Sequence, residues 1–88
     1  MKNLSKRHYK AIKNRGLINS TTIYHDFFQK ITEEMTELSN AIYDNGGTDR
    51  VNQEAIDLMM VCVNLCRWMG MDIDKELEKN VLIQEGRV

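Results

Sequence analysis

The chain has 88 residues, of which 28% are charged, and a formal net charge of −1. This length excludes more than one domain, and the longest uninterrupted apolar run, residues 58–63, is too short to predict a membrane span. With no proline, five glycines and apolar residues at helical spacing, the sequence predicts one all-α domain over residues 1–88, a small bundle of about four helices. A domain of this size buries only about 60–65% of its unfolded surface, so we expect a homo-oligomer.

A first, short helix is predicted over residues 4–15, with Gly16 as its C-terminal cap. Residues 1–25 hold six bases and no acid, whereas residues 26–88 hold six bases and thirteen acids. This basic segment could bind an anionic ligand, or it could neutralise acids of its own or a neighbouring subunit. Six basic residues form only a small positive surface for binding nucleic acid, so we expect no nucleic-acid partner.

A second helix is predicted from the N-cap residue types at 19–22 to about Asp44. Its apolar side chains recur at alternating spacings of four and three, which predicts one buried stripe. The stripe consists of Tyr24, Phe28, Ile31, Met35, Leu38 and Ile42. Glu34 falls at the edge of this apolar face, beside Phe27 and Ala41.

Two acids of the second helix, Glu34 and Glu37, are three residues apart, which places both carboxylates on one helix face. Taken alone, these two and Glu33 are more typical of a solvated surface than of a site. The third helix changes that interpretation because it carries a second pair of acids at the same spacing, Glu54 and Asp57.

The third helix is predicted over residues 50–69, after a turn at Asn45-Gly46-Gly47 and with Thr48 or Asp49 as its cap. It is apolar almost all round beyond Leu58, which indicates burial on most sides. Its polar residues fall on one narrow stripe, which consists of Glu54, Asp57, Asn64 and Arg67.

Two cysteines, Cys62 and Cys66, lie one turn apart on the third helix, with no nearby histidine or third cysteine to complete a zinc site. We therefore expect buried, reduced, structural thiols and a cytoplasmic protein. A fourth helix is predicted from about Ile73 to Gln84, capped by Asp72 or Asp74.

The two acid pairs predict a metal site if the second and third helices are antiparallel. Four unpaired carboxylates in a small helical core would repel one another, and a hard divalent cation would hold them together. An all-oxygen set suits Mg²⁺, with Mn²⁺ as the alternative. A di-iron site would need Glu-x-x-His, and neither His8 nor His25 has that spacing from a candidate glutamate.

The acid pairs also carry a resemblance to a known family. Glu33-Glu34-x-x-Glu37, sixteen residues and then Glu54-x-x-Asp57 resemble the signature of the MazG-like all-α nucleoside triphosphate pyrophosphohydrolases. Residues 54–59 and the later Leu77-Glu78-Lys79-Asn80 are also similar to that family, and the resemblance covers roughly residues 20–85. The family's basic residue three positions after the asparagine is replaced here by Ile83.

The resemblance implies Mg²⁺-dependent hydrolysis of nucleoside triphosphates to the monophosphate and pyrophosphate, by a homodimer or homotetramer. It implies that the metal ligands are Glu34, Glu37, Glu54 and Asp57. It also implies substrate contacts from Lys79 and Asn80, although the change at Ile83 puts phosphate contacts from the fourth helix in doubt.

The remaining site residues follow from the sequence. Glu33 and Glu34 are the candidate catalytic residues, and Glu33 could orient a ligand or accept a proton from water; the alternative is an ordinary exposed glutamate. Asn64 is a candidate for contacting the nucleotide substrate, or for a hydrogen bond across an interface. We expect the aromatic residues to pack in the core rather than stack on a base. They are Tyr24, Phe27, Phe28, Tyr43 and Trp68.

The leading hypothesis is therefore the hydrolase. The alternative is a non-catalytic helical oligomerisation or regulatory module that retains a metal or nucleotide pocket.

Overall fold

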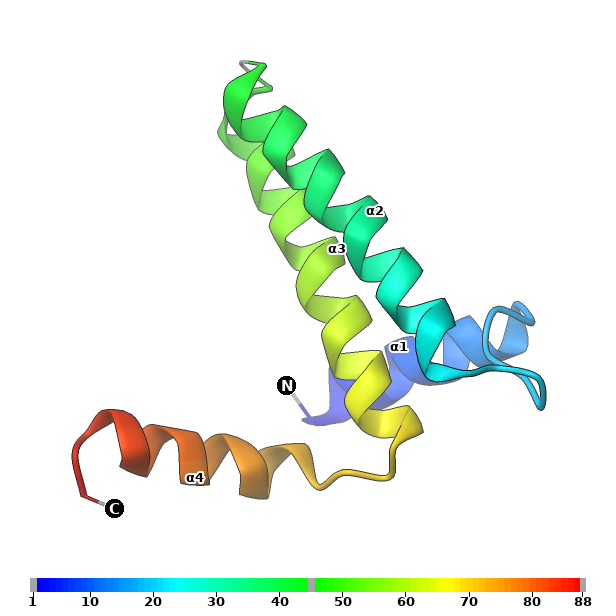
Figure 1. The fold of residues 1–88 in the computed structure, drawn as a ribbon, viewed down its shortest axis with the longest axis vertical. Coiled ribbons are helices and arrows are strands. Elements are labelled where there is room, and N and C mark those ends of the chain that lie inside the picture. The colour runs from blue at the N-terminus through cyan, green and yellow to red at the C-terminus, as the bar shows by residue number, and fades with distance from the viewer. Residues whose placement is uncertain (1, 45, 88) are drawn as a thin grey trace.

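A computed structural model of the chain describes residues 2–44 and 46–87. In this part of the chain the structure consists of four helices without strands, which confirms the all-α prediction (Figure 1). They are α1 (Lys2–Asn14), α2 (Tyr24–Tyr43), α3 (Gly47–Trp68) and α4 (Ile73–Gln84). No helix of the described residues has both the length and the apolar character needed to cross a membrane.

Helices α2 and α3 form a long antiparallel hairpin, and α1 crosses the end of it that lies away from the α2–α3 turn (Figure 1). Helix α4 projects sideways from the C-terminal end of α3 and packs little against the rest of the chain. The most extensive helix–helix contact is therefore between α2 and α3, the two helices that carry the acid pairs.

Helix α2 begins later than its cap residue types suggested. The polar side chains of residues 19–22 bond within their own turn: Thr21 N donates to Asn19 Oδ1 at 2.9 Å, and Asn19 N donates to Thr22 Oγ1 at 2.9 Å. The helix instead begins after Ile23, whose backbone N–H donates to Asp26 Oδ2 at 2.9 Å. The residues predicted as a cap thus form a separate turn.

The other helix ends agree with the sequence more closely. Gly16 has φ of 75°, the left-handed conformation expected of a C-terminal cap. Asp72 caps α4, because its Oδ1 accepts a hydrogen bond from Lys75 N at 3.2 Å. Helix α3 begins at Gly47, so Thr48 and Asp49 lie in its first turn and do not cap it. Asn45 lies outside the described residues.

The buried core is small and does not include the stripe predicted on α2. Tyr24, Phe28, Met35 and Ile42 are all more than half exposed. The buried residues of α2 are instead Phe27, Glu34 and Ala41, which recur every seven residues. The predicted stripe was wrong because the apolar arc of α2 is wider than the surface that α3 covers within one chain.

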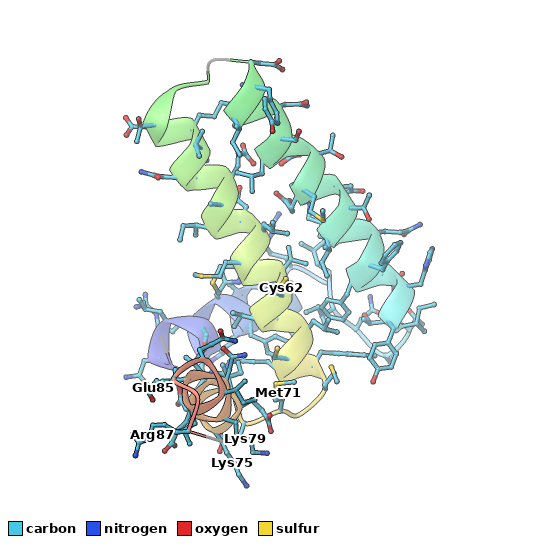
Figure 2. All side chains as sticks on the ribbon, turned by 60° about the vertical axis from the view of Figure 1, so that its left-hand side comes forward. Cys62, Met71, Lys75, Lys79, Glu85 and Arg87 are labelled. Carbon is cyan, nitrogen blue, oxygen red and sulfur yellow. The ribbon has the colours of Figure 1, made fainter. Side chains whose placement is uncertain are left out.

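The cysteine prediction was correct in one part and wrong in another. Cys62, labelled in Figure 2, and Cys66 are free thiols, as expected, but Cys62 is exposed and Cys66 is only partly buried. Neighbouring residues of α3 are also exposed, notably Ile56 and Met59. The apolar sequence of α3 predicted burial on most sides of this helix. Within a single chain, some of these apolar side chains are instead exposed to solvent.

Candidate metal centre

Carboxylates from α2 and α3 converge in the middle of the hairpin. Glu34 from α2 and Glu54 and Asp57 from α3 each offer one oxygen, and these three oxygens all lie within 4.8 Å of one another. The antiparallel packing of two helices, each with acids on the facing side, produces this arrangement. The predicted convergence of the acid pairs is thus present for Glu34, Glu54 and Asp57.

Glu34 is the most enclosed member of this cluster, with only 6% of its surface exposed. Its Oε1 accepts from Lys30 Nζ at 3.1 Å, whereas its Oε2 is buried and has no hydrogen-bond donor among the described residues. Glu54 Oε2 is in the same situation within this part of the chain. Buried carboxylate oxygens without donors are costly, so these atoms favour a partner that the described residues do not supply, such as a cation, a proton or a water molecule.

Glu37, the fourth predicted acid, lies against the same cluster although its side chain is exposed. Its pKa is raised above the ordinary value, first because its protonated carboxyl can hydrogen-bond to Glu34 and second because Glu34 carries negative charge. Glu54 acts in the same direction. The raised pKa of Glu37 reflects the negative charge that Glu34 and Glu54 concentrate in this region.

The donor set fits a hard divalent cation. Carboxylate oxygens are the ligands that Mg²⁺ and Mn²⁺ prefer, and two of the oxygens present are buried without a donor. Glu34, Glu54 and Asp57 would hold such an ion; Glu37 does not belong to this group of three, although its carboxyl lies beside Glu34 and Glu54.

Lys30 lies at the edge of the cluster. Its Nζ is 3.1 Å from Glu34 Oε1 and 3.5 Å from Glu33 Oε2. The hydrogen bond to Glu34 is the main reason that the pKa of Lys30 is raised, and burial opposes it only partly. Glu33 is a largely exposed side chain whose carboxylate points to Lys30 rather than into the cluster.

A cavity of about 240 Å³ adjoins the cluster, and Lys30 belongs to its wall. Apolar side chains from α1, α2 and α3 line it, among them Ile12, Phe27 and Val61. Asn64 supplies a polar group to the wall and is 95% buried, its exposed fraction being 5%. The site thus combines a dense negative charge with an adjacent, mainly apolar cavity, as small-molecule sites commonly do.

Asn64 has one half of its amide satisfied. Its Nδ2 lies 3.2 Å from His8 Nδ1 and can donate a hydrogen bond to that ring nitrogen. Its Oδ1 is buried and has no donor among the described residues. The amide oxygen is therefore available to a ligand that carries an N–H or O–H group.

The aromatic residues divide into a packed group and an exposed group. Trp68 contacts Tyr24 edge-on with ring centroids 4.9 Å apart, and contacts Phe27 at 5.2 Å. Packing was thus the correct expectation for Trp68 and Phe27. It was wrong for Phe28 and Tyr43, which are 63% and 80% exposed.

Lys79 and Asn80, the substrate-binding candidates on α4, lie far from the acids of the same chain. Asp57 is eleven residues before the end of α3, about 16 Å along the helix axis, and α4 extends sideways beyond that end (Figure 1). Lys79 Nζ is 3.3 Å from Glu76 Oε1, and both Lys79 and Asn80 are exposed. The structure therefore does not bring these two residues to the cluster within one chain.

The sequence interpretation missed Lys30 and His8 as residues next to the site. Lys30 precedes Glu34 by four residues, the spacing of an ion pair on one helix face, so that signal was available. His8 gave no such signal, because its contact with Asn64 joins residues 56 positions apart.

Comparisons with family models, curated proteins and solved structures gave no match. The resemblance to the MazG-like enzymes therefore stays a prediction.

Proposed function

We propose that this chain is a Mg²⁺-dependent hydrolase that converts nucleoside triphosphates to the monophosphate and pyrophosphate. The observation that carries the proposal is the convergence of Glu34, Glu54 and Asp57, with a buried oxygen of Glu34 that no described residue satisfies. Mg²⁺ held by protein carboxylates usually keeps positions for substrate phosphates, so a polyphosphate is the ligand class that suits this donor set.

The proposed roles follow from position and charge. Glu34, Glu37, Glu54 and Asp57 would hold the ion, which supplies electrostatic stabilisation of the phosphates and activation of water. Glu33 is exposed at the edge of the cluster, where its carboxylate could orient a ligand or accept a proton from water. We retain Glu33 and Glu34 as the candidate catalytic residues.

The adjacent cavity supports a nucleotide rather than an inorganic polyphosphate as substrate. Its apolar walls suit the flat face of a base, and Asn64 Oδ1 could accept a hydrogen bond from the nucleoside. Lys30 lies in the wall between this cavity and the acids. A triphosphate bound to the ion could therefore extend along Lys30 to a nucleoside in the cavity.

The test is turnover of a panel of ribo- and deoxyribonucleoside triphosphates with Mg²⁺, followed by measurement of pyrophosphate and monophosphate. We expect Glu34→Gln and Asp57→Asn each to lower the rate by at least about 100-fold, because each removes a charge that the ion requires. Glu78→Gln on α4, an exposed acid outside the cluster, is the matched control and should have no effect. Activity that survives both cluster substitutions would remove the proposed site.

We retain the non-catalytic oligomerisation or regulatory module as a second candidate because Lys79 and Asn80 lie away from the acids of their own chain. A module with a relict pocket would bind Mg²⁺ or a nucleotide without releasing pyrophosphate. Calorimetric titration with Mg²⁺ and with Mn²⁺, combined with the turnover panel, separates the two candidates.

We further propose that the protein assembles with itself, as a homodimer or homotetramer. Tyr24, Phe28, Met35 and Ile42 form a continuous exposed stripe on α2, an unusually apolar surface for an isolated small helical domain. A second copy could cover this stripe and could bring its Lys79 and Asn80 toward the acids. The two free thiols support a cytoplasmic location.

A further inference from the structure

The side chain of Lys30 lies between two different surroundings, the acids Glu33 and Glu34 and the adjacent cavity. On one side its ammonium group contacts Glu34 Oε1 at 3.1 Å and Glu33 Oε2 at 3.5 Å. On the other side Lys30 is part of the cavity wall, together with Asn64. Its side chain is 54% exposed, so the ammonium group is free to change partner without breaking a packed core.

A divalent cation bound to Glu34 would weaken the ion pair between Glu34 and Lys30. The oxygen that Lys30 contacts belongs to a carboxylate whose other oxygen is buried without a hydrogen-bond donor among the described residues. A bound cation would place two positive charges beside the ammonium group, and like charges a few ångströms apart repel strongly where water is partly excluded. Lys30 would then be free to contact another anion with its three N–H donors.

The geometry points to an exchange of partners, and we propose that Lys30 is a phosphate-binding residue. It pairs with Glu34 in this structure and contacts the polyphosphate of the substrate when a divalent cation occupies the carboxylates. This inference rests on the proposed function, since it requires a cation at the cluster and an anionic ligand beside it. It adds Lys30 to the residues that bind substrate. The ion pair with Glu34 then neutralises Lys30 only while cation and substrate are absent.

A purely structural role for Lys30 makes the opposite prediction for cation binding. If Lys30 only holds Glu34 in position, its loss should loosen Glu34 and weaken cation affinity. If Lys30 competes with the cation for Glu34, its loss should strengthen cation affinity. The sign of this change therefore distinguishes the two roles without any measurement of catalysis.

The experiment compares Lys30→Gln with the unmodified chain by calorimetry, first with Mn²⁺ or Mg²⁺ alone and then with a non-hydrolysable triphosphate in saturating cation. We expect about 3- to 10-fold tighter cation binding and about 10-fold weaker triphosphate binding, from the loss of one positive charge. At high salt the differences in cation affinity and in triphosphate affinity between Lys30→Gln and the unmodified chain should both be smaller. Trp68 fluorescence offers a second readout of the triphosphate, because Trp68 contacts Phe27 in the cavity wall.

Two further variants complete the design. Lys30→Arg keeps the charge and should retain most of the triphosphate affinity, which also guards against misfolding of the glutamine variant. Lys75→Gln on α4 removes an exposed charge outside the site and is the matched control, with no expected change in either affinity (Figure 2). Circular dichroism should show the same helix content for all four proteins.

Each outcome bears on the inference. Weaker or unchanged cation binding by Lys30→Gln, or unchanged triphosphate binding, would overturn the exchange while leaving the proposed hydrolase intact if the unmodified chain still turns over substrate. If the unmodified chain binds neither cation nor triphosphate, both the proposed function and the role of Lys30 are wrong.

Discussion

His8 on α1 accepts a hydrogen bond from Asn64 on α3, with 3.2 Å between His8 Nδ1 and Asn64 Nδ2. A second contact in the same region joins these helices, where Arg67 Nε donates to the buried Ser5 Oγ at 3.0 Å. Helix α1 is otherwise a mostly exposed, basic helix. Its position over the cavity therefore depends in part on these polar contacts with α3, beside the apolar side chain of Ile12 in the cavity wall.

Replacement of Asn64 by leucine tests this dependence. We expect the free energy of unfolding to fall by about 1–3 kcal/mol, because the variant loses the hydrogen bond and leaves His8 Nδ1 without its donor. Urea titration followed by circular dichroism gives the value, and hydrogen exchange should show faster exchange in α1. Asn52→Leu, an exposed position of α3, is the control. Equal stability of the Asn64 variant and the parent would mean that this contact does not fix α1.

The acid cluster predicts an unusual dependence of stability on pH. The pKa of Glu37 lies above its ordinary value of 4.5, so between pH 4.5 and this raised pKa the folded chain binds a proton that the unfolded chain has released. The free energy of unfolding should therefore fall as the pH rises through this window. Urea titrations at several pH values, without divalent cation, measure the slope.

Glu37→Gln is the variant that isolates this effect. Without the carboxyl at position 37 the decline in stability across the window should become shallower, because the neighbouring charges of Glu34 and Glu54 no longer retain a proton there. Glu85→Gln near the end of α4 serves as the control. A slope equal to that of the parent would show that Glu37 does not sense the cluster.

Self-association should be sensitive to one residue in the middle of the exposed stripe on α2. Met35→Glu would place a charge in any apolar interface formed there, so we expect the assembly to dissociate to monomers at micromolar concentration. Light scattering after size-exclusion chromatography gives the mass. Gln29→Glu adds the same charge on a different side of α2 and should keep the parent mass. A parent protein that is itself monomeric would contradict the proposed assembly.

Local signals predicted the helices and the acid cluster well. Gly16 and Asp72 act as caps as their residue types indicated, and Glu34 lies beside Phe27 and Ala41 as the helical repeat required. The caps and the place of Glu34 on its helix depend on residues within a few positions of one another, which sequence spacing describes directly. The acid cluster additionally depends on the antiparallel packing of α2 and α3, which brings Glu34 to Glu54 and Asp57.

Features that depend on long-range packing were not predictable in the same way. Both edges of the apolar arc on α2 fit a helical repeat, and the packing of α3 decides which edge is buried. The contact of His8 with Asn64 likewise depends on where α1 crosses the hairpin. Periodicity identifies an apolar side of a helix but does not state how much of it one neighbour can cover.

The threonines of α2 modify the character of its outer surface. Thr32 Oγ1 donates to Phe28 O at 3.0 Å, and Thr36 Oγ1 donates to Thr32 O at 3.1 Å, so both hydroxyl protons are used within the helix. These two threonines line a shallow groove with Phe28 and Met35. Each of these threonines offers water fewer hydrogen bonds than a free hydroxyl would, so hydropathy scales that count threonine as polar overstate its hydration in this groove.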